Sequence, residues 1–139
     1  MTKQIYVAGK FFDRVQIRKY MDELECMGFI ISHDWCTYES NSSNRRADMA
    51  RLDINGVKDA DIVVILMTDP KYAYRGSFTE LGTALALNKT VYIICDDPKS
   101  QCCTNVFFHH PNIIHLNSWP DFLDRLTTIH QKIELESLI

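Results

Sequence analysis

The hydrophobic positions of the chain fall into short apolar runs that alternate with segments of helical periodicity. Residues 61–67 and 91–95 are nearly continuous apolar runs, which are typical of strands covered on both faces. Residues 5–8, 29–32 and 112–116 are shorter runs of the same kind. The pattern therefore predicts five strands.

Helix-like segments lie between these runs. Residues 13–27 place apolar side chains three or four positions apart, and Gly28 follows as a residue favoured just beyond a helix. Residues 45–58 are only loosely periodic, and residues 76–82 open a further helical segment that ends in residues 88–89. Ser118 is a suitable cap for a last helix, which has a proline in its first turn.

Strands that alternate with helices predict right-handed crossovers and a parallel sheet. We therefore expect an α/β fold: a single domain over residues 1–139, with a doubly wound five-stranded parallel sheet in flavodoxin-like order. Residues 39–44 are polar and rich in Ser and Asn, which indicates a mobile loop.

Charge and hydropathy narrow the classes of partner. The chain has 15 basic and 18 acidic residues and a net charge of −3, which argues against binding to nucleic acid polymers. No apolar run approaches the roughly 20 residues of a membrane span. The N-terminal residues enter a strand without a signal-peptide core, so we expect a cytoplasmic protein.

The cysteines indicate the same compartment. They are five in number and contain no C-x-x-C pair, as expected of free thiols in a reducing environment. Cys102 and Cys103 lie near three histidines, but the spacing matches no zinc pattern, and adjacent cysteines rarely ligate one tetrahedral ion well. The expectation is a protein without a metal or cofactor.

The most informative stretch is residues 76–82, Gly-Ser-Phe-Thr-Glu-Leu-Gly, which follows the strand at 61–67. We expect Glu80 in the first turn of the next helix, near the carboxyl end of the sheet, where ligands collect in open parallel sheets. A structural alternative is a capping box between Ser77 and Glu80. The flanking glycines leave room for a ligand, and a second acid, Asp53, precedes the same strand.

Three stretches carry a resemblance to a known family. Residues 5–9 (Ile-Tyr-Val-Ala-Gly), 52–64 and 76–89 agree in order and spacing with the nucleoside 2-deoxyribosyltransferase family and with related N-glycosidases of deoxynucleoside monophosphates. The resemblance covers roughly residues 5–95. It implies cleavage of an N-glycosidic bond with retention, and a nucleoside or nucleotide as the small-molecule substrate.

The resemblance also implies catalytic roles. Glu80 matches the family's nucleophile, Asp53 the acid that serves the departing base, and Tyr6 an aromatic hydroxyl that orients the nucleophile. A retaining mechanism implies carboxyl groups about 5–5.5 Å apart. The positive end of the helix dipole is expected to keep Glu80 ionised. Taken alone, Tyr6 would be a core tyrosine and Asp53 a surface acid.

The first loop is a candidate for phosphate binding. In nucleotide-cleaving relatives the corresponding loop binds a 5′-phosphate, which here implies Gly9, Lys10 and Arg14 as substrate-binding residues. Two phenylalanines replace small residues in this loop. An equal alternative is that Lys10 and Arg14 are ordinary solvated charges.

The remaining substrate-binding candidates follow the second and third strands. Trp35, with Tyr38, either stacks on a base or covers the sheet edge. Gly76 and Ser77 lie beside the predicted nucleophile. Tyr74 stands where several transferases carry an acidic residue that helps to hold the sugar, which is a departure from the family pattern.

Two other functions stay open at this point. Domains that cleave the nicotinamide glycosidic bond of NAD share a flavodoxin-like sheet and one catalytic Glu. A non-catalytic nucleotide-binding module is also compatible with Tyr74. The resemblance further implies a homodimer or a higher homo-oligomer.

Overall fold

Five strands form one sheet in the order β2-β1-β3-β4-β5, and every neighbouring pair is parallel. This confirms the doubly wound, flavodoxin-like prediction. The computed structural model describes residues 2–38 and 45–138, so the predicted loop at 39–44 lies outside the described residues. The strands are β1 (Gln4–Ala8), β2 (Ile30–Ile31), β3 (Ile62–Leu66), β4 (Thr90–Ile94) and β5 (Ile113–Leu116).

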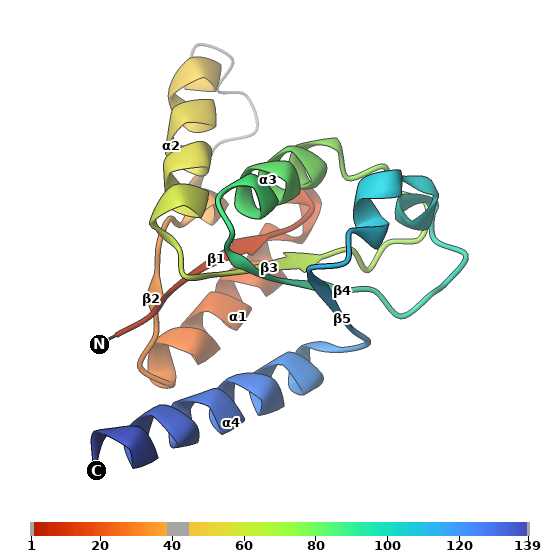
Figure 1. Ribbon diagram of the computed structural model, residues 1–139. Helices are drawn as coiled ribbons and strands as arrows, with labels where there is room; N and C mark the ends of the chain where they lie inside the picture. Colours follow the sequence, from red (N-terminus) through yellow and green to blue (C-terminus); the bar gives the residue numbers. More distant parts are fainter. Residues whose placement is uncertain (1, 39–44, 139) are drawn as a thin grey trace.

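Helices cover both faces of the sheet. Helices α2 and α3 lie on one face, and α1 and α4 lie on the other (Figure 1). The helices are α1 (Arg14–Cys26), α2 (Arg46–Asp59), α3 (Arg75–Ala86) and α4 (Trp119–Ser137). Short 3₁₀ turns occur at η1 (Phe11–Asp13), η2 (Trp35–Thr37), η4 (Gln101–Thr104) and η5 (Val106–His109).

The core is centred on the two middle strands. All five residues of β3 are buried, as are the last four of β1 and of β4. A strand with helices on both sides has no solvent-facing side, so its sequence is continuously apolar rather than alternating. None of the helices described is long and apolar enough to cross a membrane.

The predicted helix ends agree with the structure at two places. Gly28 follows α1 with a φ of +96°, a left-handed conformation that glycine adopts at little cost. The Ser118 side chain accepts a hydrogen bond from the Asp121 amide at 3.2 Å, which caps α4.

The predicted start of α3 is wrong. The helix begins at Arg75, and Ser77 is a buried residue of its first turn, so no capping box forms with Glu80. Tyr74 precedes the helix in the left-handed region, with φ 53° and ψ 41°. Its buried hydroxyl accepts a hydrogen bond from the Asp69 amide at 2.9 Å, which holds this turn. Glu80 therefore lies in the second turn rather than the first.

Candidate active site

A cavity of about 210 Å³ lies between β1, α2 and α3. Seven of the ten predicted site residues line it, whereas Tyr6, Lys10 and Arg14 do not. The loops after β1 and β3, the turn η2 and the two helices supply its walls, which consist of Gly9, Phe11, Trp35, Tyr38, Asp53, Tyr72, Tyr74, Gly76, Ser77 and Glu80.

The carboxylate of Glu80 is the least satisfied polar group of the cavity. Glu80 as a whole is half-buried, but its Oε2 is shielded from solvent and has no hydrogen-bond partner among the described residues. An unpaired buried acceptor costs about 1–3 kcal/mol, so it needs an explanation such as a bound proton or a ligand. The position suits a group that acts on a ligand.

Burial raises the pKa of Glu80 to about 8, and the nearby Asp53 adds to the rise, although a hydrogen bond with Tyr6 opposes it. The prediction of a carboxylate kept ionised by the helix dipole is therefore wrong for the ligand-free protein. The dipole effect falls off within the first turn, and Glu80 lies beyond that turn. Desolvation dominates instead.

Tyr6 lies beneath the two acids, in the middle of β1. Its side chain is buried, and its hydroxyl is within hydrogen-bonding reach of both Glu80 and Asp53. Burial and the two carboxylates raise the pKa of Tyr6 far above its ordinary value. Tyr6 therefore stays protonated and can donate a hydrogen bond to either acid.

Asp53 belongs to a hydrogen-bonded chain that the sequence did not indicate. The Tyr38 hydroxyl donates to Asp53 Oδ1 at 3.0 Å, and His33 Nε2 lies 2.6 Å from the same hydroxyl. The tautomer of the His33 ring decides which of the two groups donates in this shorter contact. Burial raises the pKa of Asp53, while Tyr38, His33 and Tyr6 oppose the rise. The chain holds Asp53 toward the cavity.

Aromatic side chains form much of the cavity wall. Trp35 donates from Nε1 to the Val7 carbonyl at 2.6 Å, which fixes its ring against β1. Tyr72 and Tyr74 pack edge to face with ring centroids 4.7 Å apart. Phe11 and Tyr72 were not predicted, because no local motif distinguishes a wall aromatic from an ordinary surface or core aromatic.

Lys10 and Arg14 lie outside the cavity wall. Lys10 Nζ pairs with Asp69 Oδ2 at 2.8 Å and lies 5.1 Å from the centre of the Tyr72 ring, above the cavity rim. The Arg14 guanidinium lies 4.7 Å from the centre of the Phe11 ring, and Arg14 borders a different hollow beside Val15 and Cys36. Phosphate binding by these cations stays a prediction.

A second, larger hollow adjoins the cavity. It measures about 700 Å³ and shares Tyr38 with the cavity wall. Typical ligand pockets measure about 300–1,000 Å³, so the cavity alone is small for a nucleotide, and the two hollows together are large enough. The larger one is lined by His33, Thr37, Tyr38, Arg45, Asp48, Met49, Arg51 and Leu52.

The fold and the site together define a class of protein: a doubly wound α/β protein with two half-buried acids and a buried tyrosine at a cavity beside its sheet. A sequence model of the family described as nucleoside 2-deoxyribosyltransferase matches residues 5–114. The chain belongs to this family. A comparison with curated proteins gave no match.

Two solved structures share the fold. A CMP N-glycosidase from Clostridium botulinum, BcmB, has 18% sequence identity and a TM-score of 0.59, with 91% of this chain and 99% of that chain covered. A 2-deoxyribosyltransferase from Bacillus psychrosaccharolyticus has 22% identity and the same TM-score of 0.59, with 86% and 89% covered. Family membership and fold agree with the expectation drawn from residues 5–95.

Proposed function

We propose that the protein cleaves the N-glycosidic bond of 2′-deoxyribonucleosides or their 5′-monophosphates through a glycosyl-enzyme intermediate on Glu80. One observation carries the proposal: the shielded Glu80 Oε2 has no partner among the described residues and lies near Tyr6 and Asp53, in the wall of a cavity. Family membership supports the reaction class. In this proposal Glu80 is the nucleophile, Asp53 the acid and the buried Tyr6 the orienting donor.

The first step joins Glu80 to the sugar. A carboxylate oxygen of Glu80 attacks the anomeric carbon, the bond to the base breaks, and Asp53 gives a proton to the departing base. Burial raises the pKa of both acids, that of Glu80 to about 8, so Glu80 holds a proton near neutral pH. The reactive form has that proton on Asp53. The Tyr6 hydroxyl, in reach of both acids, supports its passage between them.

The second step releases the sugar. Water or an acceptor base attacks the anomeric carbon, Asp53 takes the proton of the attacking group, and the Glu80 carboxylate is freed. Two inversions at the same carbon give net retention. Whether water or a base is the acceptor decides between a hydrolase and a transferase.

The aromatic walls suit a nucleoside. Trp35 and Tyr72 present ring surfaces to the cavity, and stacking on aromatic rings tolerates any base. Lys10, at the rim beside Tyr72, is the proposed partner of a 5′-phosphate, with Gly9 as the closest approach of the loop backbone. The small Gly76 and Ser77 leave room beside Glu80.

The test is a substrate panel followed by mass spectrometry of the intact protein. Deoxynucleosides, their monophosphates and NAD are incubated with and without a free acceptor base, and products are separated by chromatography. We expect base release from at least one deoxynucleoside or monophosphate, and a deoxyribosyl adduct that maps to Glu80. The Glu80→Ala variant should give neither. NAD consumption alone, or base release that Glu80→Ala retains, would contradict the proposal.

A non-catalytic binding module is the second candidate, and Tyr74 favours it. This buried residue replaces an acid found in several transferases, and its hydroxyl is already bound by the Asp69 amide. Tight binding of a nucleoside monophosphate without any product after long incubation would identify this function.

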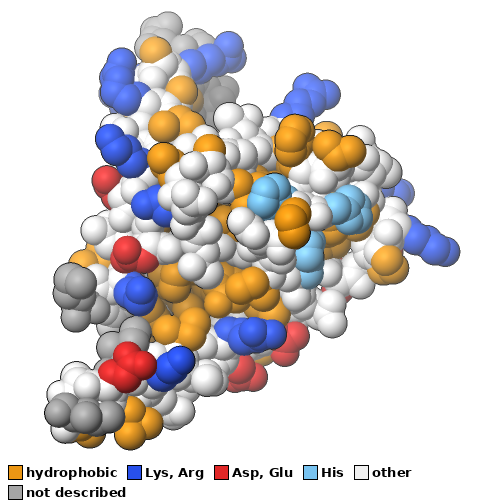
Figure 2. Space-filling view, viewed as in Figure 1, with side chains coloured by type: hydrophobic (Ala, Val, Ile, Leu, Met, Phe, Trp, Pro, Cys, Tyr) orange, Lys and Arg blue, Asp and Glu red, His pale blue; other side chains and the backbone are white. Residues whose placement is uncertain are grey.

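The proposal includes a homodimer or a higher homo-oligomer. Phe12, Val106 and Phe107 expose 84%, 76% and 59% of their surface, and exposed apolar side chains that gather in a patch mark interaction sites. On the face shown in Figure 2, hydrophobic side chains lie beside histidines over the region of η4 and η5. Light scattering coupled to size-exclusion chromatography should give a mass of at least two chains; a mass of one chain would contradict it.

A further inference from the structure

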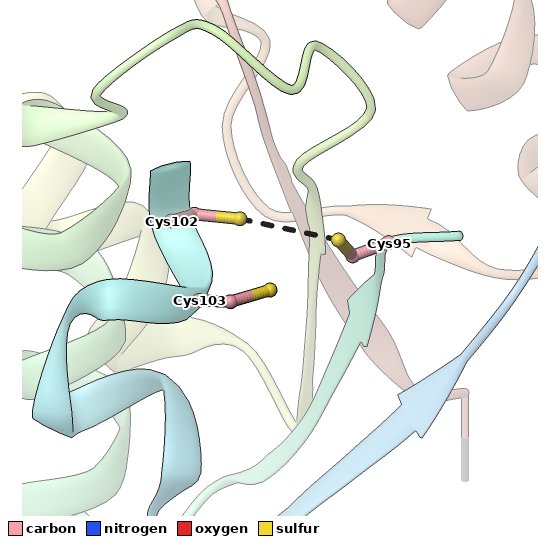
Figure 3. A group of neighbouring side chains, drawn as sticks. All are labelled: Cys95, Cys102 and Cys103. Carbon is pink, nitrogen blue, oxygen red and sulfur yellow. Dashed lines mark hydrogen bonds between the residues drawn. The ribbon is translucent and has the colours of Figure 1, made fainter. Parts of the chain in front are cut away.

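Three cysteines from two separate elements converge at the carboxyl end of β4. Cys95 directly follows the strand, and Cys102 and Cys103 lie on the turn η4 (Figure 3). The three sulfur atoms lie within 4.8 Å of one another, and the Sγ atoms of Cys95 and Cys102 are 3.9 Å apart. All three are free thiols. The sequence placed only the adjacent pair together, because the position of Cys95 depends on the fold.

Hydrogen bonds hold this cluster in place. The Ser100 amide donates to the Asp97 carbonyl at 3.1 Å, and the Cys103 amide donates to the Ser100 carbonyl at 3.0 Å, so the loop after β4 folds back over the strand end. The Ser100 hydroxyl lies 3.7 Å from the Cys95 sulfur and is buried. It can donate to a Cys95 thiolate, as outer-shell partners of metal ligands do.

A ligand can reach the sulfur atoms from solvent. A hollow of about 430 Å³ is bordered by Cys95 and Cys103, and by Phe108, His109 and His115. Cys95 and Cys103 are half-buried, and Cys102 is buried behind them. The cluster thus combines a shielded side with an entry path, which a metal site requires.

We propose that Cys95, Cys102 and Cys103 form a binding site for one soft metal ion, with Cu(I) in three-coordinate geometry as the ion that fits. Thiolates select soft ions such as Cu(I). An ion equidistant from three sulfurs that lie 3.9 to 4.8 Å apart would be roughly 2.3–2.8 Å from each, so a small inward shift gives the usual metal–thiolate distance of about 2.3 Å. The site is separate from the Glu80 cavity and does not depend on the proposed catalytic function.

The donor set favours Cu(I) over zinc. Structural zinc sites are almost always four-coordinate and tetrahedral. Among the described residues, the group of mutually close ligand atoms contains the three sulfurs and no histidine or carboxylate. Three ligands from one strand end and one turn therefore leave a zinc ion short of a protein ligand.

Binding exchanges protons for the ion without any change of oxidation state. One Cu⁺ replaces the hydrogens of three thiols, and three protons pass to the buffer. The apparent affinity must therefore rise with pH.

The experiment is an anaerobic titration of the reduced full-length chain against the coloured bicinchoninate complex of Cu(I). We expect one Cu(I) per chain, tighter binding at higher pH, and three sulfur neighbours by X-ray absorption. The Cys102→Ser and Cys95→Ser variants should each lose more than the roughly 10–100-fold that an outer-shell partner contributes. An equal concentration of Zn²⁺ should leave the titration unchanged.

The chain offers matched controls in Cys26 and Cys36, which lie outside the cluster. The Cys26→Ser and Cys36→Ser variants should bind Cu(I) like the wild type. Circular dichroism establishes that each variant is folded, and Cys103→Ala replaces any variant that is not. The proposal is overturned if the wild type takes no copper from bicinchoninate, if the cluster variants retain it, or if zinc displaces it.

Discussion

The Glu80 carboxyl group is where burial, charge and hydrogen bonding conflict most strongly. Its pKa rises from 4.5 to about 8, first because it is buried, and further because Asp53 is close, while Tyr6 opposes both. Between these two pH values the folded protein binds more protons than the unfolded chain. The free energy of unfolding must then fall as pH rises through this window. If Glu80 is the nucleophile, its burial therefore lowers the free energy of unfolding at neutral pH.

Glu80→Gln should therefore stabilise the protein above neutral pH. The amide cannot ionise, so the variant avoids a buried charge, and we expect a gain of about 1–3 kcal/mol at pH 8 that disappears near pH 4.5. Urea unfolding at the two pH values measures the difference. The exposed Glu136→Gln serves as the control and should show no gain. A variant less stable than the wild type at pH 8 would contradict the buried, unpaired carboxylate.

Tyr6 and Asp53 should shift the titration of Glu80 in opposite directions. Tyr6→Phe removes the hydrogen bond that lowers the pKa of Glu80, so this pKa should rise. Asp53→Asn removes a nearby negative charge, so the pKa should fall. Carbon-13 NMR of the labelled carboxyl group follows both changes without requiring activity. Tyr92→Phe, a buried tyrosine packed on Phe122, is the control and should change nothing.

The close approach of α2 to β1 sets the position of Asp53 relative to Tyr6. A Cβ on Gly56 would lie 2.7 Å from His33 Cβ and 2.8 Å from Tyr6 Cε1, closer than real contacts allow. Asp53 lies one turn earlier on the same face of α2. The absence of a side chain at Gly56 therefore brings Asp53 into reach of Tyr6.

Gly56→Ala should push α2 away from the sheet. We expect a loss of about 1–3 kcal/mol of unfolding free energy, since overpacking outweighs the better helix propensity of alanine. It should also weaken the contacts of Asp53, which the NMR titration of its carboxyl group would report. Gly82→Ala is the matched control: it lies in the interior of α3, a Cβ there meets nothing within 4 Å, and it should add about 0.5–1 kcal/mol. Equal changes in unfolding free energy for the two variants would contradict a steric role for Gly56.

The elements themselves were largely predictable from sequence, because long apolar runs such as residues 61–67 leave few alternatives to a buried strand. The start of α3 was not predictable from sequence. Its first turn is held by the ring and hydroxyl of Tyr74, a long-range packing effect, whereas the sequence offered Ser77 as the better local cap. Local capping preferences lose when tertiary contacts fix a different turn.

The site was predictable where a motif or a resemblance marked it. Glu80, Asp53 and Tyr6 lie near one another, as the resemblance implied, and their catalytic roles stay a prediction. The hydrogen bonds from His33 through Tyr38 to Asp53 have no sequence signal, because they join η2 to α2 across the fold. The pairing of Lys10 with Asp69 also has no sequence signal, because it joins two loops that are far apart in the chain.

The ion pair between Lys10 and Asp69 connects the loops after β1 and β3, and these two strands are neighbours in the sheet. With a net charge of −3, the chain has no general attraction for anionic substrates. Any preference for a monophosphate must therefore come from a local cation. Lys10 is half-buried at the cavity rim, and its partner Asp69 competes with a phosphate for it.

If Lys10 holds the 5′-phosphate, changes at the two partners should act oppositely. Lys10→Ala should raise the KM for the deoxynucleoside monophosphate and leave that for the free deoxynucleoside unchanged, because only the former loses a charge-assisted contact. Asp69→Asn should lower the KM for the monophosphate, because it frees the ammonium group. A loss of one such contact is worth about 1.5–3 kcal/mol, or roughly 10–150-fold.

Arg14→Ala supplies the control for this pair, since Arg14 is the other cation near the first loop and does not line the cavity. It should alter neither KM if Lys10 is the phosphate ligand. Steady-state kinetics with the nucleoside and its monophosphate, measured in parallel on the three variants, separates the cases. An equal rise in both KM values for Lys10→Ala would mean that Lys10 orders the two loops rather than binding phosphate. A rise in the KM for the monophosphate that is confined to Arg14→Ala would mean that Arg14, rather than Lys10, binds the phosphate.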